Sequence, residues 1–401
     1  MIKPEILSPA GDKERLDAAL MFGADAVYLG GDAFTMRAAP ENFGAEELAK
    51  AVKKCHEKNV KVYLTVNTLP RNSEILLLPS FLEQWDDAGV DGFIVADIGV
   101  LSLCKKYAPR VPVHISTQAG IVNYVTANEF YNMGASRIVT ARELSLNEIA
   151  EIRAKIPKEL EIECFVHGAM CVSFSGRCLL SNYLLNRDAN RGECAQPCRW
   201  EYAIMEKKRD GMYFPIDDTE NGTYILNSKD MCMIEHIPEL VSAGINSFKI
   251  EGRAKSAYYA AVITNAYRAA VDEYMQNPSP DFKPSQWITE ECYKVSYRDY
   301  CTGFYFNAPN ENAQVSFEGG YIRHCDIAAV VTKCEDGYIF AEQRNKFCKG
   351  EELDALEPRK EPVFFNADEI FDLEGNELES LPHPMMQFKI KSDLIFPAGT
   401  M

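Results

Sequence analysis

The amino-acid sequence predicts an α/β fold: a TIM-like (β/α)8 barrel followed by a small C-terminal β-barrel domain. Short apolar segments alternate with amphipathic helical segments over residues 1–275, and most of the connections between them are short. A further observation separates the second domain, because the hydrophobic pattern changes to a period of two beyond about residue 318. The expected boundaries are 1–278 for the barrel, 279–317 for a helical linker and 318–401 for the small β-barrel.

The barrel strands are expected where short apolar runs end in polar residues. They are assigned to residues 5–10, 24–30, 61–67, 92–97, 113–118, 137–141, 160–167 and 247–251. The matching helices are assigned to residues 12–22, 46–58, 73–88, 99–107, 123–133, 145–155, 229–243 and 256–275. Several helices end in glycine just before the next strand, as in Phe22-Gly23-Ala24. Asp12 and Glu14 begin the first helix and suit its positive N-terminal end.

One long segment interrupts this regular pattern. Residues 168–228 follow the seventh strand and form a cysteine-rich insertion. Because active sites of such barrels lie at the C-terminal ends of the strands, the insertion leaves from the active-site face. After the barrel, a short helical stretch is expected at about 283–300, and turns at 335–337 and 373–376 separate the strands of the last domain.

Composition limits the possible classes of protein. Of the 401 residues 47% are hydrophobic and 25% charged, and the longest apolar runs are strand-length, well short of the roughly 20 residues that span a bilayer. The N-terminus has no signal-peptide pattern, so we expect a cytoplasmic protein with no membrane partner and with reduced thiols. The net charge of −17 argues against loose, charge-driven binding of nucleic acid, although a local basic patch could still bind one folded RNA.

The cysteines are unevenly distributed. Five of the thirteen lie between Cys164 and Cys198. Four of them, Cys171, Cys178, Cys194 and Cys198, have the spacing C-x6-C-x15-C-x3-C, which suits an iron–sulfur cluster or, less well, zinc. Their alternative role is that of small buried hydrophobic residues. Cys164 is expected in the core, and Cys232 is expected to open a helix and to be a reserve ligand. The remaining seven cysteines, Cys292 among them, are expected to be structural.

Polar side chains gather at the expected strand ends and are candidates for the active site. They include Tyr28, Asn67, Gln118, Arg142, Glu163, His167, Lys249, Glu251 and Arg253. Several guanidinium and ammonium groups at one face could bind a dicarboxylate or a phosphate by paired hydrogen bonds. The alternative is a set of structural salt bridges at the barrel rim.

A peptidase site is also conceivable. His167 precedes Cys171 by four residues, so the two could form a nucleophile pair. No third residue that would orient the histidine is apparent, and the sequence contains neither a Gly-x-Ser-x-Gly nor a His-Glu-x-x-His motif.

Several motifs resemble those of a known family. They are Glu-Cys-Phe-Val-His-Gly-Ala-Met-Cys at 163–171, Ser-Gly-Arg-Cys-Leu-Leu-Ser at 175–181, Asn-Ser-Lys-Asp at 227–230 and Phe-Lys-Ile-Glu-Gly-Arg at 248–253. In these segments the chain resembles peptidase family U32, the collagenase-like peptidases, over nearly its whole length. Despite that label, several branches of the family are oxygen-independent hydroxylases. The branch that this chain resembles most makes 5-hydroxyuridine at the wobble position of tRNA with prephenate as the oxygen donor.

The resemblance implies a [4Fe-4S] cluster held by Cys171, Cys178, Cys194 and Cys198, with prephenate as co-substrate and the anticodon region of tRNA as partner. Related branches hydroxylate rRNA or work with a second family member as partner subunit. We expect His167, Glu163, Lys249 and Glu251 to be catalytic, and Arg142, Arg177, Arg253, Tyr28, Asn67 and Gln118 to bind substrate. Tyr28 or Tyr202 could stack on the extruded base. Arg344, Lys346 and Lys349 are candidate phosphate contacts of the last domain, a possible RNA-binding module.

Overall fold

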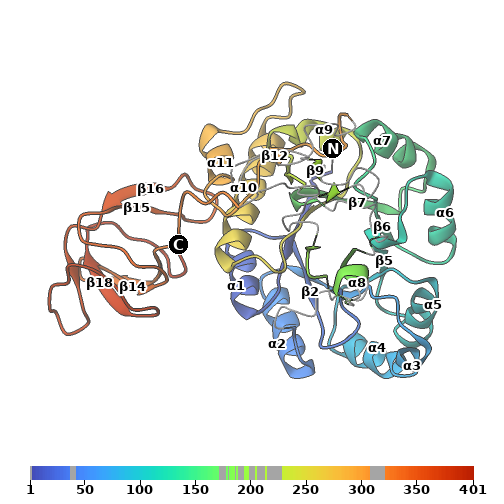
Figure 1. Cartoon of the computed structure of the whole chain (residues 1–401), viewed down its shortest axis with the longest axis horizontal. Coiled ribbons are helices and arrows are strands. Elements are labelled where there is room, and N and C mark those ends of the chain that lie inside the picture. Colours follow the sequence, from blue (N-terminus) through green and yellow to red (C-terminus); the bar gives the residue numbers. More distant parts are fainter. Residues whose placement is uncertain are drawn as a thin grey trace.

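The barrel that the sequence predicts is present in the computed structural model of the chain. The structure describes residues 2–36, 42–170, 178, 180–185, 187, 194–197, 204–205, 213–214, 228–307 and 321–401. Eight parallel strands form the barrel: β1 (Glu5–Pro9), β2 (Ala26–Gly30), β3 (Lys61–Val66), β4 (Gly92–Val95), β5 (Val113–Ile115), β6 (Arg137–Val139), β7 (Glu161–Ala169) and β11 (Ser247–Ile250). They pair in the order β11-β1-β2-β3-β4-β5-β6-β7, and β11 also pairs with β7, which closes the ring (Figure 1).

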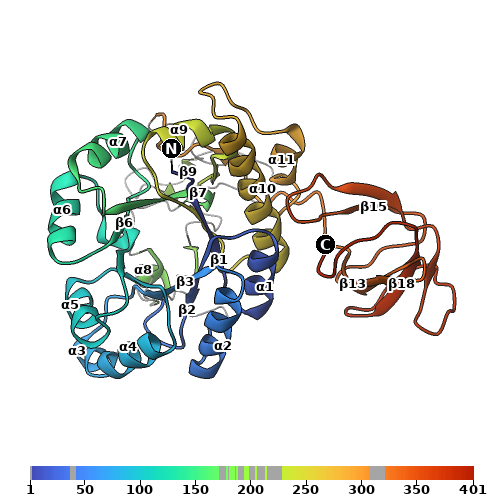
Figure 2. The ribbon, with the colours of Figure 1, turned by 180° about the vertical axis from the view of Figure 1, so that it is seen from behind.

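Helices surround the barrel, as Figure 2 shows from behind. They are α1 (Lys13–Met21), α2 (Ala45–His56), α3 (Asn72–Ile75), α4 (Leu78–Asp87), α5 (Ile98–Tyr107), α6 (Tyr124–Asn132), α7 (Leu146–Lys155), α9 (Ile237–Ser242) and α10 (Ala257–Gln276), with a short 3-10 turn η1 (Thr117–Ala119) before α6. The strands are apolar because both of their faces are covered; all five residues of β2 are buried. Asp12 caps α1 by accepting a hydrogen bond from the backbone N–H of Arg15 (2.9 Å), as its position in the sequence indicated.

Two predicted helices differ from the structure. The helix predicted at 73–88 is divided into α3 and α4. Pro79 disfavours one continuous helix because it has no backbone N–H to donate, and it is tolerated in the first turn of α4, where that N–H is not needed. The helix predicted at 229–243 begins instead with a strand, β10 (Asp230–Cys232), and continues as the 3-10 turn η4 (Ile234–His236) and α9. Cys232 therefore ends a strand and does not open a helix.

The additional strand extends the sheet at the long strand β7. Strand β10 pairs antiparallel with the end of β7, so that Cys232 lies opposite His167, and β12 (Tyr300–Cys301) pairs parallel with β10. A buried ion pair fixes β10, because the guanidinium of Arg298 donates to the carboxylate of Asp230 at 2.6 Å. The unpaired backbone groups beyond the barrel on β7 thus find partners, which a pattern of local hydrophobicity does not reveal.

The C-terminal domain consists of antiparallel strands beside α10 and α11 (Gln286–Glu291), the described helix of the predicted linker (Figure 1). Its strands are β13 (Ala329–Glu335), β14 (Tyr338–Gln343), β15 (Glu352–Ala355), β16 (Val363–Asn366), β17 (Ile370–Phe371) and β18 (Gln387–Lys391). They pair as a four-stranded sheet, β13-β14-β18-β17, and a hairpin, β15-β16. Asn265 of α10 accepts a hydrogen bond from the backbone N–H of Arg359 (2.6 Å), and Leu356 packs into the core of the barrel, so the two domains are in direct contact.

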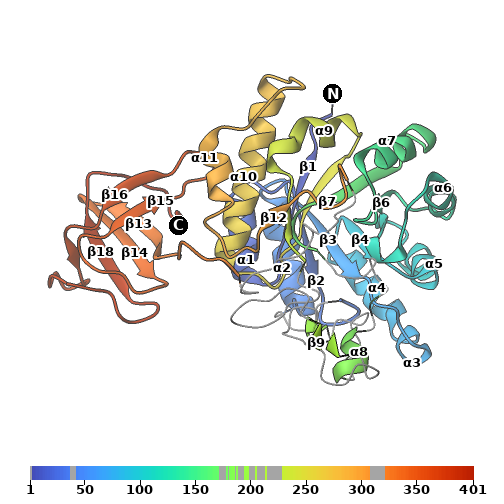
Figure 3. The ribbon, with the colours of Figure 1, turned by 45° about the horizontal axis from the view of Figure 1, so that its top comes forward.

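The described parts of the insertion lie at one end of the barrel. Helix α8 (Leu180–Leu185) and strand β9 (Tyr213–Phe214), which pairs with β8 (Ile204–Met205), are at the end opposite to the N-terminus (Figure 3). This is the end where the C-termini of the barrel strands lie, as predicted for the active-site face. Among the described helices, none is both long enough and apolar enough to cross a membrane.

Candidate active site

A small cavity of about 80 Å³ lies at the C-terminal ends of the barrel strands. Seven of the predicted site residues line it: Tyr28, Asn67, Gln118, Arg142, Lys249, Glu251 and Arg253. They come from loops or strands at five different places in the chain, and the closed barrel brings them together. Among the described residues, the lining contains three cationic side chains and one carboxylate, that of Glu251. The cavity therefore favours an anionic ligand.

Lys249 links the floor of this cavity to the barrel interior. Its ammonium group lies 2.6 Å from the Oε1 atom of Glu163, a residue with no exposed surface, and 4.5 Å from the centre of the Tyr28 ring. The hydroxyl of Tyr28 donates to the backbone carbonyl of Ile250 (2.9 Å). Tyr28 is therefore held as part of the cavity wall, and Glu163 lies beneath the cavity.

Arg253 is held rigidly at the cavity wall. Its Nη1 atom donates to the hydroxyls of Thr35 (2.8 Å) and Thr65 (3.0 Å), and its Nη2 atom donates to the side-chain oxygen of Asn42 (2.9 Å). A Cβ atom at Gly30 would lie 2.6 Å from that Nη2 atom, so a glycine is needed beside the guanidinium. Fixed in this way, Arg253 contributes a permanent positive charge rather than a mobile arm.

Arg142 keeps donors that the described residues do not use. Its Nη1 atom donates to the carbonyl of Ala169 (2.7 Å), its Nη2 atom is 4.0 Å from Glu251, and the guanidinium stacks 3.9 Å from the centre of the Phe165 ring. Its Nε atom is buried and has no hydrogen-bond partner among the described residues. A buried donor without a partner destabilises the protein, so this guanidinium is suited to donate hydrogen bonds to an anionic ligand.

A network of buried charges fills the barrel below the cavity. Its members Glu163 and Lys249 were predicted from the sequence, whereas Arg137, Glu5 and Glu161 were not. Arg137 donates to Glu5 (2.7 Å), Glu161 (2.5 Å) and Glu163 (3.1 Å). Glu5 also accepts a hydrogen bond from Tyr63 (2.6 Å). The signal was present, because two charged residues, Glu5 and Arg137, open strands that are otherwise apolar. The network includes Glu163, the carboxylate that neutralises Lys249, and so determines the charge at the floor of the cavity.

The network predicts a loss of stability in acid. Burial alone would raise the pKa of Glu5, but the charge of Arg137 and several hydrogen bonds hold that pKa below its ordinary value of 4.5. A carboxylate with a lowered pKa stabilises the fold above its ordinary pKa, and the contribution is lost as the pH falls through the folded-state value. We expect the urea midpoint of the wild type to fall between roughly pH 6 and pH 3, and Glu5→Gln to weaken this dependence. An unchanged slope in Glu5→Gln would contradict the assignment.

His167 lies outside the cavity, in a second, buried cluster. Its ring is packed among Tyr259, Tyr267 and Tyr300, with centroid distances of 6.0, 5.6 and 5.2 Å. Only 1% of its surface is exposed. The predicted catalytic set is therefore divided: Lys249 and Glu251 line the cavity and Glu163 lies beneath it, whereas His167, near the end of β7, lies outside the cavity.

Two cysteines accompany His167. The ligand atoms of His167, Cys232 and Cys292 all lie within 4.8 Å of one another. The main cause of a pKa shift at both cysteines is a hydrogen bond between the two thiols. This hydrogen bond holds the pKa of Cys232 well below the ordinary thiol value and raises the pKa of Cys292 well above it. The sequence predicts only a structural role for Cys292, because nothing in the local sequence connects residue 292 with residue 167.

The predicted cluster cysteines are only partly described. Cys171 and Cys198 lie outside the described residues, as do Arg177 and Tyr202. Cys178 is half-buried and Cys194 exposed. The backbone N–H of Ala195 donates to the hydroxyl of Ser181 (3.2 Å), so the stretches that carry Cys178 and Cys194 are in direct contact.

A larger cavity of about 670 Å³ lies between the barrel and the C-terminal domain. Arg142 and Glu251 line both cavities, so the two adjoin at these side chains. Gln196, two residues from Cys194, also lines the larger one. The insertion therefore borders a cleft that leads from the barrel mouth to the second domain.

The predicted phosphate contacts differ in how they are paired. Arg344 lines the larger cavity but is ion-paired with Glu342 and lies 3.6 Å from Glu14. Lys349 is paired with Glu377. Lys346 is exposed and has no ion pair within the described part of the chain. Of the three, Lys346 is the cation best placed to meet a phosphate.

The sequence matches two protein-family descriptions: residues 11–315 match Peptidase family U32, and residues 323–401 match the Peptidase family U32 C-terminal domain. The chain is 37% identical to tRNA hydroxylation protein P1 of Bacillus subtilis strain 168, over 100% of this chain and 94% of that protein. It is 43% identical to an uncharacterized protease of Methanocaldococcus jannaschii, over 79% of this chain and 77% of that protein. A solved U32 peptidase structure aligns at 16% identity over 63% of this chain and 94% of that one, with a TM-score of 0.42.

Proposed function

The chain belongs to peptidase family U32 over both of its domains, and from this membership we propose that it is a tRNA-modifying enzyme. The reaction is the hydroxylation of the wobble uridine to 5-hydroxyuridine, with prephenate as the oxygen donor. The full-length similarity to a tRNA hydroxylation protein supports the substrate. The observation that carries the chemistry is the cationic cavity at the barrel mouth, with the unused donor of Arg142.

The size of the cavities indicates how a dicarboxylate would bind. The small cavity of about 80 Å³ has room for one carboxylate, whereas ligand pockets usually measure about 300 Å³ or more. Arg142 can bind that carboxylate while the rest of the molecule extends into the adjoining cavity of about 670 Å³. Arg253 and Lys249 add positive charge behind it, and their own hydrogen bonds keep them in place.

The described cysteines suit a cluster in this region. Cys178 and Cys194 come from two stretches in direct contact, and thiolates are the usual ligands of iron–sulfur clusters. Together with Cys171 and Cys198 they would hold a [4Fe-4S] cluster beside the larger cavity. When bound, the cluster would supply electron transfer or substrate coordination. The chain itself provides Arg142 for the carboxylate of the ligand. It also provides Glu251, whose carboxylate lines the small cavity, as a proton acceptor.

The RNA would enter through the cleft between the domains. The described lining of this cleft has a small excess of positive charge on a chain of net charge −17. It consists of the cations Arg142, Lys255, Arg323 and Arg344 and the carboxylates Glu14, Glu251 and Asp326, and Arg323 is ion-paired with Asp326. A uridine in the anticodon loop has to leave its stack before its C5 atom can reach the barrel mouth. Lys346 on the second domain would then bind backbone phosphate, and its replacement should weaken binding without altering the site of hydroxylation.

Peptidase activity is a second candidate, because one relative is named a protease. The nucleophile pair of that proposal would be His167 and Cys171. The burial of His167 among three tyrosines argues against it, since a general base has to reach a substrate peptide. The Cys194→Ala variant separates the two functions, because it should abolish hydroxylation and leave proteolysis intact.

The nucleosides of host tRNA test the proposed function. We expect a deletion strain to lack wobble 5-hydroxyuridine derivatives, the wild-type gene to restore them, and Cys194→Ala not to restore them. Lys346→Gln is the milder comparison and should restore them in part. Unchanged tRNA nucleosides in the deletion strain, with no second copy of the gene, would contradict the proposal.

A further inference from the structure

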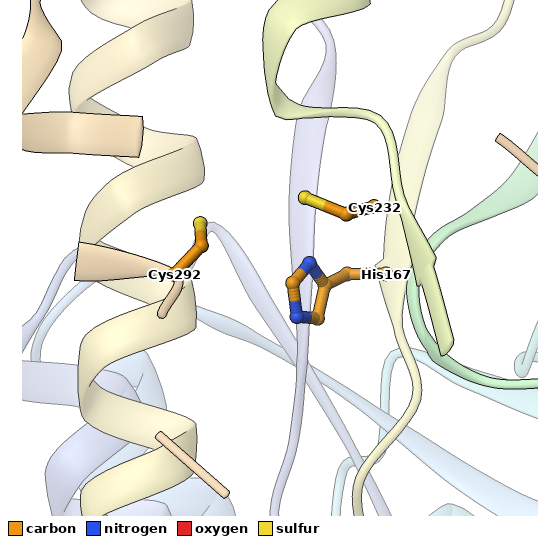
Figure 4. Close-up of side chains that lie close together, drawn as sticks. All are labelled: His167, Cys232 and Cys292. Carbon is orange, nitrogen blue, oxygen red and sulfur yellow. The ribbon is translucent and has the colours of Figure 1, made fainter. Parts of the chain in front are cut away.

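We propose that His167, Cys232 and Cys292 form a binding site for a single thiolate-binding metal ion of the zinc class. Figure 4 shows the two sulfur atoms and the imidazole ring turned toward a common space. Their ligand atoms lie within 4.8 Å of one another, close enough for one ion to contact all three after small side-chain rotations.

Three separate elements build the site. His167 is near the end of β7, and Cys232 lies directly opposite it on β10. Cys292 directly follows α11 as its C-cap residue, sixty positions after Cys232 in the chain. Two sheet partners and one helix terminus thus bring soft donors to one point. Convergence of this kind is unexpected for cysteines that serve only as small apolar residues.

The hydrogen bonds around His167 leave the correct nitrogen available. The hydroxyl of Tyr300 donates to the carbonyl of Cys292 (2.6 Å), so its oxygen can accept from the Nε2 atom of His167 (3.4 Å). That arrangement places the imidazole proton on Nε2 and leaves a lone pair on Nδ1. A second bond from the far nitrogen of a ligating histidine is the usual support for a metal ligand.

The Nδ1 atom is the observation that points to a ligand. It is buried, and within the described part of the chain it makes no hydrogen bond of good geometry, although the neighbouring Cys232 thiol interacts with the imidazole. A buried polar atom without a partner destabilises the fold, and a metal ion bonded to it would remove that penalty. Two thiolates and one imidazole are a donor set that zinc accepts, with a fourth position open to water or another donor.

The site is separate from the proposed hydroxylation site. Of its three residues, none lines the cavity of about 80 Å³ or the cavity of about 670 Å³. The proposed iron–sulfur cluster depends on other cysteines, so either proposal can fail without the other. A single ion here would connect β7, β10 and α11 and so stabilise the wall of the barrel behind the active site.

The test is metal analysis and zinc-edge X-ray absorption on the full chain, purified without oxygen. We expect about one zinc per chain beyond the iron, with about two sulfur ligands and one nitrogen ligand. Cys292→Ser should lose the zinc and keep its iron and sulfide. Cys301→Ser is the matched control, because Cys301 lies on β12 beside the site but outside the donor set, and it should keep the zinc.

Three results would overturn the proposal. The first is zinc below a tenth of an equivalent in the wild type after growth and dialysis with added zinc sulfate. The second is full zinc retention in Cys292→Ser. The third is loss of iron and sulfide in Cys232→Ser, which would make Cys232 a ligand of the cluster instead. If Cys292→Ser fails to fold, the melting temperatures of the wild type and of His167→Gln are compared with and without zinc sulfate. The proposal predicts that zinc raises the melting temperature of the wild type alone.

Discussion

Replacing Arg142 with glutamine should lower kcat/KM for prephenate by about 100-fold. The charge-assisted hydrogen bonds of the guanidinium to a carboxylate are worth about 3 kcal/mol in a buried site, and 1.4 kcal/mol corresponds to a factor of ten. Arg142→Lys should lie between the wild type and Arg142→Gln, because it keeps the charge and loses the paired donors. The measurement is hydroxylation of tRNA at varied prephenate concentrations.

The matched control for this prediction is Arg110→Gln. Arg110 is an exposed arginine paired with Asp86 and Asp87, remote from both cavities, so its loss should leave kcat/KM unchanged. Both variants should keep the iron content and the melting temperature of the wild type. A kcat/KM for Arg142→Gln within a factor of three of the wild type would remove Arg142 from the carboxylate site.

Replacing Glu163 with glutamine should lower the free energy of unfolding by about 3 kcal/mol. Glu163 has no exposed surface and neutralises both Lys249 and Arg137, so its replacement leaves buried positive charge with too few partners. Urea denaturation at neutral pH measures the change. Activity should fall as well, because Lys249 at the cavity floor loses the group that positions it.

Glu161 provides the comparison for this variant. It accepts from the same arginine, Arg137, at 2.5 Å, but 44% of its side chain is exposed. Water replaces a lost partner at such a position, so Glu161→Gln should cost less than about 1 kcal/mol. Equal costs for Glu161→Gln and Glu163→Gln would mean that burial does not determine the strength of this network.

Much of the fold could be predicted from local patterns. Each barrel strand is a short apolar run, and each short loop fixes the direction of the next element, so the barrel follows from the order of the elements alone. The error at residues 229–243 has a different origin. Strand β10 forms because β7 extends beyond the barrel and because Asp230 pairs with Arg298. Both partners, β7 and Arg298, lie far from β10 in the sequence.

The candidate site was predictable to a similar degree. Residues at strand ends, such as Tyr28, Asn67 and Arg253, converge because the barrel closes, and the sequence indicates where strands end. Two features were not predictable. The side chain of His167 leaves the barrel interior at an irregular pairing of β7 with β11, and Cys292 reaches it through the packing of α11 against α10. Three-dimensional packing alone determines such contacts.

The most direct test of the proposed function follows the oxygen atom. Protein purified without oxygen is incubated under the same conditions with unmodified tRNA and with prephenate labelled with oxygen-18 in its hydroxyl group, and the tRNA nucleosides are analysed by mass spectrometry. The account predicts 5-hydroxyuridine that carries the label, formed by the wild type and by Arg110→Gln. Unlabelled 5-hydroxyuridine, or none from a preparation with its full complement of iron and sulfide, would contradict it.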